Sequence, residues 1–147
     1  MLTTSDGVRL NYLERSPPQG GSGPTVLVLV PGWCMPAFVW EPQLAEFGAR
    51  MRTIALDPRG QGDSAVPDGG YTADRRAADL RDLLEPLPRV VLVGWSLGGL
   101  EALHYVYRYG AGRLAALMLV DNSVGEPPAP APTKFLDELR RDRGATV

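Results

Sequence analysis

Histidine and cysteine are nearly missing from this sequence, which contains only His104 and Cys34. A single cysteine excludes a disulfide bond within the chain. A single histidine leaves one imidazole as a candidate general base. Lysine is equally scarce, because Lys134 is the one lysine among the 15 basic residues. The arginines are scattered and the formal net charge is −2, so the charge predicts neither a nucleic-acid partner nor binding to an anionic membrane surface.

Long apolar runs are missing as well. The longest are Val26–Val30 and Val90–Val93, far shorter than the roughly 20 residues that cross a bilayer as a helix. Met1–Tyr12 alternates polar and apolar side chains and lacks the apolar segment of a signal peptide. The 147 residues, 44% of them apolar, predict one domain with a core of its own. We expect a cytoplasmic protein.

Short strands are the first kind of element that the sequence predicts. A hairpin is expected at the start, with Met1–Thr4 and Val8–Glu14 on either side of a Ser-Asp-Gly turn. Continuous apolar runs then predict strands buried on both faces. These runs are Thr25–Val30, Met51–Leu56, Arg89–Val93 and Leu114–Val120.

Helices are expected between the buried strands, because apolar residues recur there at helical spacing. Three stripes mark three helices: Trp40, Leu44 and Phe47; Ala73, Ala77, Leu80, Leu84 and Leu87; and Leu100, Leu103 and Tyr107. Thr72 is the predicted N-cap of the second helix. Strands that alternate with helices predict an α/β fold, a doubly wound and mostly parallel sheet with helices on both faces.

The composition changes near residue 125. Residues 1–125 carry the strand and helix pattern and form the predicted core domain. The segment Glu126–Pro132 holds four prolines in seven residues, which favours an extended or irregular conformation. Thr133–Arg143 has the spacing of a short amphipathic helix. Residues 126–147 are therefore interpreted as a separate, proline-rich region.

A Gly-x-Ser-x-Gly motif at Gly94–Gly98 gives the strongest functional signal. It lies between a predicted strand and a predicted helix, where a tight turn holds the serine hydroxyl out above the sheet. A Cβ two residues before or after that serine would clash, so glycine is needed at both places. The N-terminus of the helix adds partial positive charge near a developing oxyanion. Ser96 is the candidate nucleophile.

The loop Val30–Trp33 gives the second signal, because it leaves the strand that is expected beside the Ser96 strand. An oxyanion hole needs two backbone N–H groups that converge on one point. The residue after the nucleophile, Leu97, supplies one, and Trp33 is the candidate for the other. Taken alone, the same loop also fits an ordinary strand-to-helix connection.

Three ordered motifs, Pro31–Trp33, Asp57–Ser64 and Gly94–Gly99, resemble those of the α/β-hydrolase superfamily. Within it, the Gly-Trp-Ser-Leu-Gly-Gly turn and the Pro-Gly-Trp loop are most similar to esterases that act on pimeloyl carrier-protein methyl ester, and to related carboxylesterases. One departure is Pro31, since the family usually has histidine before this glycine. The resemblance implies that the Asp57–Ser64 loop is structural. It also implies that residue 126 begins a lid.

The same resemblance implies a fold truncated after about its sixth strand of eight. The family's catalytic histidine follows the eighth strand and its catalytic acid usually follows the seventh. Asp121 ends the sixth strand, where some relatives place the acid, although an aspartate there is more often a turn residue. His104 lies about 12 Å along its helix from Ser96, beyond the reach of about 3 Å that a general base needs. We interpret His104 as structural and Cys34 as a packing residue.

These observations predict a serine esterase that acts on a small-molecule acyl substrate through an acyl-enzyme. No metal or organic cofactor is implied. Two alternatives stay open: a non-catalytic binding module that reuses the pocket, or one half of a split enzyme. The strand Leu114–Val120 would have an unpaired apolar edge, so self-association through this edge is also expected.

Overall fold

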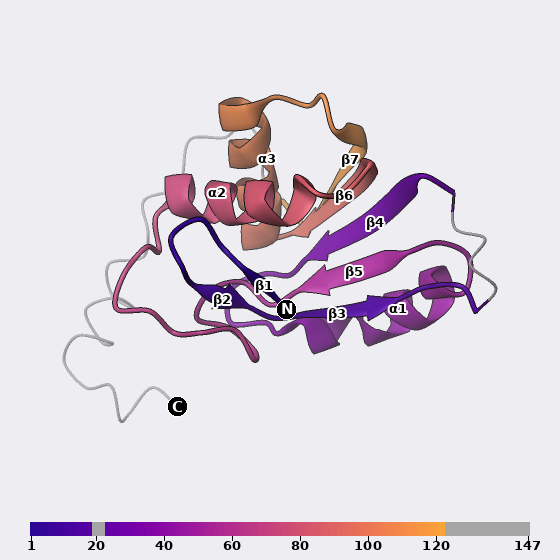
Figure 1. The fold of residues 1–147 in the computed structure, drawn as a ribbon, viewed down its shortest axis with the longest axis horizontal. Coiled ribbons are helices and arrows are strands. Elements are labelled where there is room, and N and C mark those ends of the chain that lie inside the picture. The colour runs from indigo at the N-terminus through magenta and orange to yellow at the C-terminus, as the bar shows by residue number, and fades with distance from the viewer. Residues whose placement is uncertain (19–22, 123–147) are drawn as a thin grey trace.

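A computed structural model describes residues 1–18 and 23–122 of the chain (Figure 1). Its main sheet has five strands in the order β3-β5-β4-β6-β7. Their bounds are β3 Tyr12–Arg15, β5 Thr53–Leu56, β4 Thr25–Val30, β6 Arg89–Trp95 and β7 Leu114–Val120. Only β3 runs antiparallel to its neighbour, and the other three pairings are parallel. The prediction of a mostly parallel α/β sheet is confirmed.

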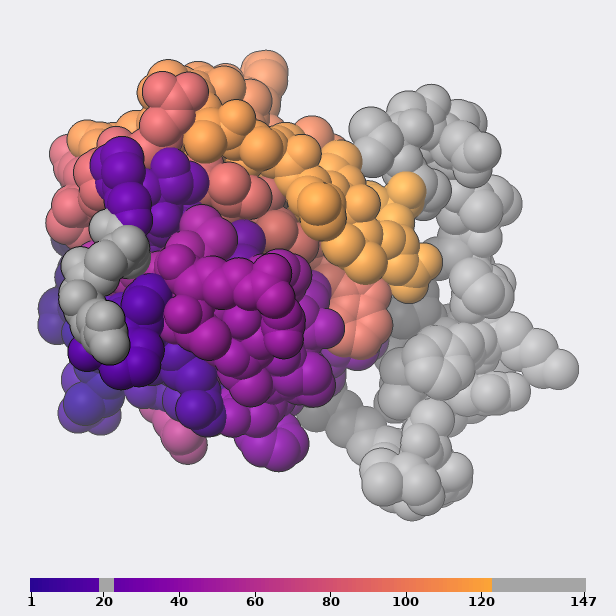
Figure 2. Space-filling view, turned by 90° about the vertical axis from the view of Figure 1, so that its right-hand side faces the viewer, coloured from indigo at the N-terminus to yellow at the C-terminus, as the bar shows by residue number. Residues whose placement is uncertain are grey.

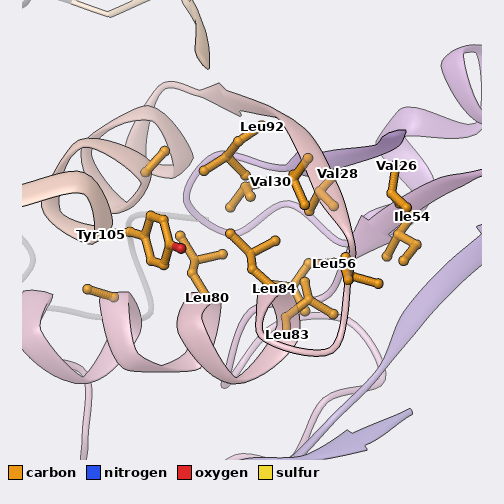
Figure 3. Close-up of a cluster of buried hydrophobic side chains, with 14 of the residues drawn as sticks. Val26, Val28, Val30, Ile54, Leu56, Leu80, Leu83, Leu84, Leu92 and Tyr105 are labelled. Atoms are coloured by element: carbon orange, nitrogen blue, oxygen red, sulfur yellow. The ribbon is translucent and has the colours of Figure 1, made fainter. Parts of the chain in front are cut away.

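Helices cover both faces of this sheet, as predicted. On one face lie η1 (Ala37–Trp40) and α1 (Glu41–Gly48), and on the other lie α2 (Ala73–Leu84) and α3 (Leu97–Tyr109). Alternate residues of each strand therefore enter two separate cores. The larger core joins the sheet to α2 and α3 (Figure 3) and includes Val28, Val30, Leu56, Leu80, Leu84, Leu92 and Tyr105. The smaller one packs Leu27, Leu29, Ala55 and Val93 against Ala37, Trp40 and Leu44.

The predicted hairpin strand Val8–Glu14 is divided in two. Only β1 (Leu2–Thr3) and β2 (Arg9–Leu10) form a small antiparallel sheet, and the chain then enters the main sheet as β3. Asn11 separates the two pieces. Its backbone N–H donates to Ser64 Oγ at 2.8 Å, and its Nδ2 donates to Asp57 Oδ2 at 2.8 Å. These distant partners draw the chain away from β1, which local sequence spacing does not reveal.

Helix α2 starts as predicted, because the Thr72 hydroxyl accepts a hydrogen bond from the Arg75 N–H at 3.3 Å. Helix α3 differs from its prediction. Leu100 and Tyr107 of the expected apolar stripe are 50% and 82% exposed. The buried side instead carries Gly98, Gly99, Glu101, Ala102 and Tyr105. Because α3 leaves β6 after a single residue, its first turns lie against the strand ends, where only small side chains fit.

Strand β7 also differs from its prediction as a buried strand. It pairs with β6 on one side, and no other strand among the described residues pairs with it. Met118 is 56% exposed, and side chains of β7 (orange) lie on the molecular surface in Figure 2. An edge position explains this exposure, since a strand with one neighbour has less of the sheet and its helices to cover it. The expected lid and helix, residues 126–147, lie outside the described residues.

Candidate active site

Ser96 is the single residue between strand β6 and helix α3. Its backbone has φ 51° and ψ −117°, a conformation that residues other than glycine rarely adopt. The chain thus reverses from strand to helix within one residue. The strained turn predicted from the Gly-x-Ser-x-Gly motif is confirmed.

The glycines on either side of Ser96 allow this turn. A Cβ on Gly98 would lie 2.5 Å from the carbonyl oxygens of Val30 and Pro31. A Cβ on Gly94 would lie 2.6 Å from the carbonyl carbon of Gly98. Both neighbours are backbone atoms that cannot shift without cost, which confirms that glycine is required at these two positions.

Hydrogen bonds from β7 and the residues after it hold the turn from one side. The Ser96 N–H donates to the Val120 carbonyl at 2.9 Å. The Ser96 carbonyl accepts from Asn122 Nδ2 at 2.6 Å and from the Gly99 N–H at 2.9 Å. Sequence analysis missed Asn122. Its place two residues after a strand that pairs with β6 was the available signal.

The loop after β4 lies against Ser96 from the other side. A Cβ on Gly32 would lie 3.4 Å from Ser96 Cβ, so this glycine lets the loop approach closely. Neither the Trp33 nor the Leu97 backbone N–H has a hydrogen-bond acceptor within residues 1–18 and 23–122. Both candidate oxyanion donors are therefore unpaired within the described residues, and both belong to residues that line the same hollow.

Gln61 holds this loop in place, a role that sequence analysis also missed. Its Oε1 accepts from the Cys34 N–H at 2.6 Å, and its Nε2 donates to the Met35 carbonyl at 3.3 Å. The bond to Cys34 supports a left-handed backbone there, with φ 57°. Cys34 itself is exposed, so its interpretation as a packing residue is wrong.

The Asp57–Ser64 loop is bound tightly to its surroundings, as the family resemblance implied. Asp57 accepts from the Ala37 N–H at 2.5 Å, and Ser64 Oγ donates to the Asp57 carbonyl at 2.6 Å. Arg59 is almost completely buried and donates to both Asp79 carboxylate oxygens at 2.6 Å. These contacts connect β5, η1 and α2, and so shape the floor behind the Trp33 loop.

The structure does not bring His104 to Ser96. His104 Nε2 lies 2.7 Å from Asp74 Oδ1, across from α3 to α2, and Arg108 Nη1 donates to the same oxygen at 3.1 Å. The hydrogen bond with His104 and the Arg108 charge hold the pKa of Asp74 below its ordinary value. Asp121 follows β7 at φ 51° and is exposed. Within the described part of the chain, its carboxylate forms no hydrogen bond to Ser96 or His104.

A hollow of about 720 Å³ opens beside the turn. Its wall is mainly apolar and aromatic, with Trp33, Tyr71, Leu97, Leu100, Leu103 and Tyr107 among the lining residues. Arg76, Glu101 and His104 add charged or polar groups to it. The hollow is bounded by Leu97, the residue after Ser96, and by Trp33, and its mainly apolar wall is typical of a small-molecule site.

Among residues 1–18 and 23–122, no helix is both long and apolar enough to span a bilayer. The same residues contain no cluster of three or more His, Cys, Asp or Glu side chains suited to a metal ion.

Comparison with known proteins gives consistent matches. The model of the alpha/beta hydrolase family matches residues 27–146. A non-heme chloroperoxidase, CPO-A1 of Kitasatospora aureofaciens, is 41% identical over 82% of this chain and 42% of its own length. An N-formylmaleamate deformylase of Pseudomonas putida is 34% identical over 94% of this chain and 52% of its own length. The structure of the Rhodococcus esterase RhEst1 superposes with a TM-score of 0.71 at 35% identity, over 80% of this chain and 43% of that one. The chain thus spans about half the length of these relatives.

Proposed function

The chain belongs to the α/β-hydrolase family, and on that premise we propose that Ser96 is the nucleophile of a serine esterase. The observation that carries the proposal is the position of Ser96, alone between strand and helix at φ 51° and against the Gly32 loop. The three relatives are named as a chloroperoxidase, a deformylase and an esterase. An ester or related acyl substrate agrees with the serine itself, because serine forms acyl-enzymes.

In the proposed reaction, Ser96 Oγ attacks the acyl carbon while its proton passes to a general base. The carbonyl oxygen becomes an oxyanion and accepts hydrogen bonds from the Trp33 and Leu97 N–H groups, which lack other acceptors within the described residues. The alcohol leaves with a proton, and water then hydrolyses the acyl-enzyme. His104 is not proposed as the base because it lies two turns into helix α3 and, within the described residues, forms its hydrogen bond with Asp74 and none with Ser96. The expected base is a histidine outside this chain's 147 residues, in a longer form or on a second chain.

Two further assignments belong to this proposal. Asp121 is kept as a candidate catalytic acid, supported by its place at the end of the strand that binds the Ser96 N–H. A cytoplasmic location is kept as well, supported by the single cysteine, which is free.

The test is covalent labelling with a fluorophosphonate, followed by peptide mass spectrometry, on this chain and on any longer form of it. We expect the adduct on Ser96, and Ser96→Ala should abolish it. Ser5→Ala is the matched control, since Ser5 lies at the N-terminus and should leave labelling unchanged. An adduct on another serine would contradict the assignment. In a catalytically complete form, Ser96→Ala should lower esterase activity by several orders of magnitude.

The same measurements separate the alternatives. For the 147-residue chain alone we expect negligible hydrolysis of p-nitrophenyl esters, because an oxyanion hole without a base leaves only weak activity. Activity restored by mixing with a second, histidine-containing chain would support a split enzyme. A complete form that binds acyl compounds but neither hydrolyses them nor reacts at Ser96 would support the binding module.

A further inference from the structure

Arg76 of helix α2 lies where two hollows meet. The larger hollow, beside Ser96, and a second one of about 350 Å³ are both lined by Trp33, Tyr71 and Arg76. Trp33 and Leu97, the proposed oxyanion donors, line the larger hollow as well. Arg76 therefore lines the same hollow as both proposed oxyanion donors.

Arg76 is largely buried yet has only one acceptor for its guanidinium. Its side chain is 11% exposed, and its Nη1 donates to Glu101 Oε1 at 2.7 Å. The guanidinium also lies 5.9 Å from the centre of the Tyr71 ring. A guanidinium has five N–H donors, and within residues 1–18 and 23–122 no other acceptor is bonded to this one.

Arg59, which lines the smaller hollow, provides a contrast. It donates to both oxygens of Asp79 and also to Asp6, so two carboxylates neutralise it. Arg76 has Glu101 alone, and further donors remain for a ligand. Of the two arginines at this junction, Arg59 is neutralised by two carboxylates and Arg76 by one, and only Arg76 lines the larger hollow.

The carboxylate that neutralises Arg76 is itself easily protonated. Burial raises the pKa of Glu101 to about 7, although Arg76 opposes the rise and Asp79 adds to it. Arg76 and Asp79 face Glu101 from α2. Tyr71 and His104 line the same hollow, and His104 is bonded to Asp74. Near neutral pH about half of the Glu101 side chains are protonated, which leaves the Arg76 charge without a counter-ion.

We propose that Arg76 binds a carboxylate carried by the acyl substrate, in competition with Glu101. This inference rests on the proposed function of Ser96 and names the substrate class, a half-ester of a dicarboxylic acid. Leu100, Leu103 and Tyr71 would pack along its methylene chain. Guanidinium suits this role because it binds carboxylates in a paired geometry.

The test is ligand binding to the full chain, followed by the change in tryptophan fluorescence. Of the three tryptophans, Trp33 is 69% exposed and lines both hollows. Monomethyl glutarate is the probe and dimethyl glutarate is its neutral match. We expect the half-ester to bind at least about tenfold more tightly at pH 6. Its affinity should fall about tenfold from pH 6 to pH 8, because the protonated fraction of Glu101 falls from about 0.9 to about 0.1.

Substitutions assign the effect. Arg76→Gln should remove the preference for the half-ester, whereas Arg108→Gln, outside both hollows, should keep it. Glu101→Gln should give tight binding that no longer varies between pH 6 and pH 8. His104→Gln should keep the pH dependence, which excludes His104 as its source. Because an unpaired buried charge can unfold a variant, the double variant Arg76→Gln with Glu101→Gln provides a neutral pair, and it should also lack the preference.

Equal binding of the two esters, or binding of neither, would overturn the proposal. An unchanged preference in a folded Arg76→Gln variant, verified by circular dichroism, would do so too. Binding requires no turnover, and Ser96→Ala should bind the half-ester normally. If Ser96 is not labelled but the half-ester still binds more tightly than the diester, only the proposed nucleophile is refuted. If Ser96 is labelled but the two esters bind equally, only the role of Arg76 is refuted.

Discussion

The two edges of the sheet, β3 and β7, are built in opposite ways (Figure 1). β3 is short, and charged residues protect its exposed end: Glu14 binds Arg52 at 2.7 Å, and Arg15 binds Glu41 of α1. β7 is seven residues long, wholly apolar in sequence and exposed at Met118 and Val120. The β3 edge thus carries charges that discourage pairing with another chain. The β7 edge is apolar and exposed, and such an edge can pair with a further strand.

Ser96 follows β6, the neighbour of β7, and contacts both the β4 loop on the β3 side and the residues that end β7. The Gly32 loop and Gln61, on the β3 side, form part of a dense network that includes Asp57 and Arg59. On the β7 side, Ser96 is held by hydrogen bonds with Val120 and Asn122. We therefore expect disturbances of the buried network to affect folding strongly and changes on β7 to affect association.

Arg59→Met should have the largest effect, because it leaves Asp79 buried without its partner. Loss of one member of a buried ion pair costs about 3–5 kcal/mol. Urea unfolding followed by circular dichroism measures the change. Arg52→Met is the control on the β3 edge, where a partly exposed pair contributes about 0–1 kcal/mol. Equal losses of stability for the two variants would show that the buried Arg59 pair contributes no more than the partly exposed Arg52 pair.

Gly98→Ala should destabilise the turn by about 1–3 kcal/mol, since its Cβ would press on the Val30 and Pro31 carbonyls. It should also abolish fluorophosphonate labelling of Ser96 by shifting the turn. Gly112→Ala is the matched control, because a Cβ there meets no atom within 4 Å. A folded Gly98→Ala variant that labels at the normal rate would contradict the tight packing of this turn.

Acid should weaken the contact of helix α2 with the N-terminal turn through Asp82, which accepts a hydrogen bond from the Ser5 N–H. Burial raises its pKa, but hydrogen bonds from the Ser5 N–H and Arg81 outweigh this and hold the pKa below the ordinary 3.8. A lowered folded-state pKa means stability that is present above about pH 4 and is lost as the pH falls through the folded pKa. Asp82→Asn should flatten the stability curve below pH 4. Asp68→Asn, in a loop, should leave the curve as it is.

Met118→Lys should change stability least, by about 0.5 kcal/mol or less, because it replaces an exposed side chain. Its effect should be on association, since a charge on an edge strand opposes pairing with another chain. Size-exclusion chromatography with light scattering should show a larger monomer share than for the unmodified chain. Val66→Lys replaces an apolar residue away from β7 that is even more exposed than Met118 (77% against 56%), and it should not raise the monomer share. If both lysines act alike, general surface hydrophobicity explains the association.

Local patterns were enough to predict much of this molecule. The four parallel strands, the Thr72 cap and the turn at Ser96 depend on neighbours in sequence, so their residues show them directly. The failures have a common cause. The break at Asn11, the exposed stripe of α3 and the exposure of β7 each depend on how elements pack in three dimensions, which the spacing of apolar residues does not show.

By itself, the sequence determined the sheet and the candidate nucleophile, because apolar runs and paired glycines permit few other local structures. Only the tertiary structure decided that Gln61 and Asn122 hold the two sides of the turn, and that His104 faces Asp74. It also decided that Arg76 and Glu101, 25 residues apart, meet in the wall of the larger hollow. Their pairing could not be read from spacing, since it depends on how α2 and α3 pack over the same face of the sheet.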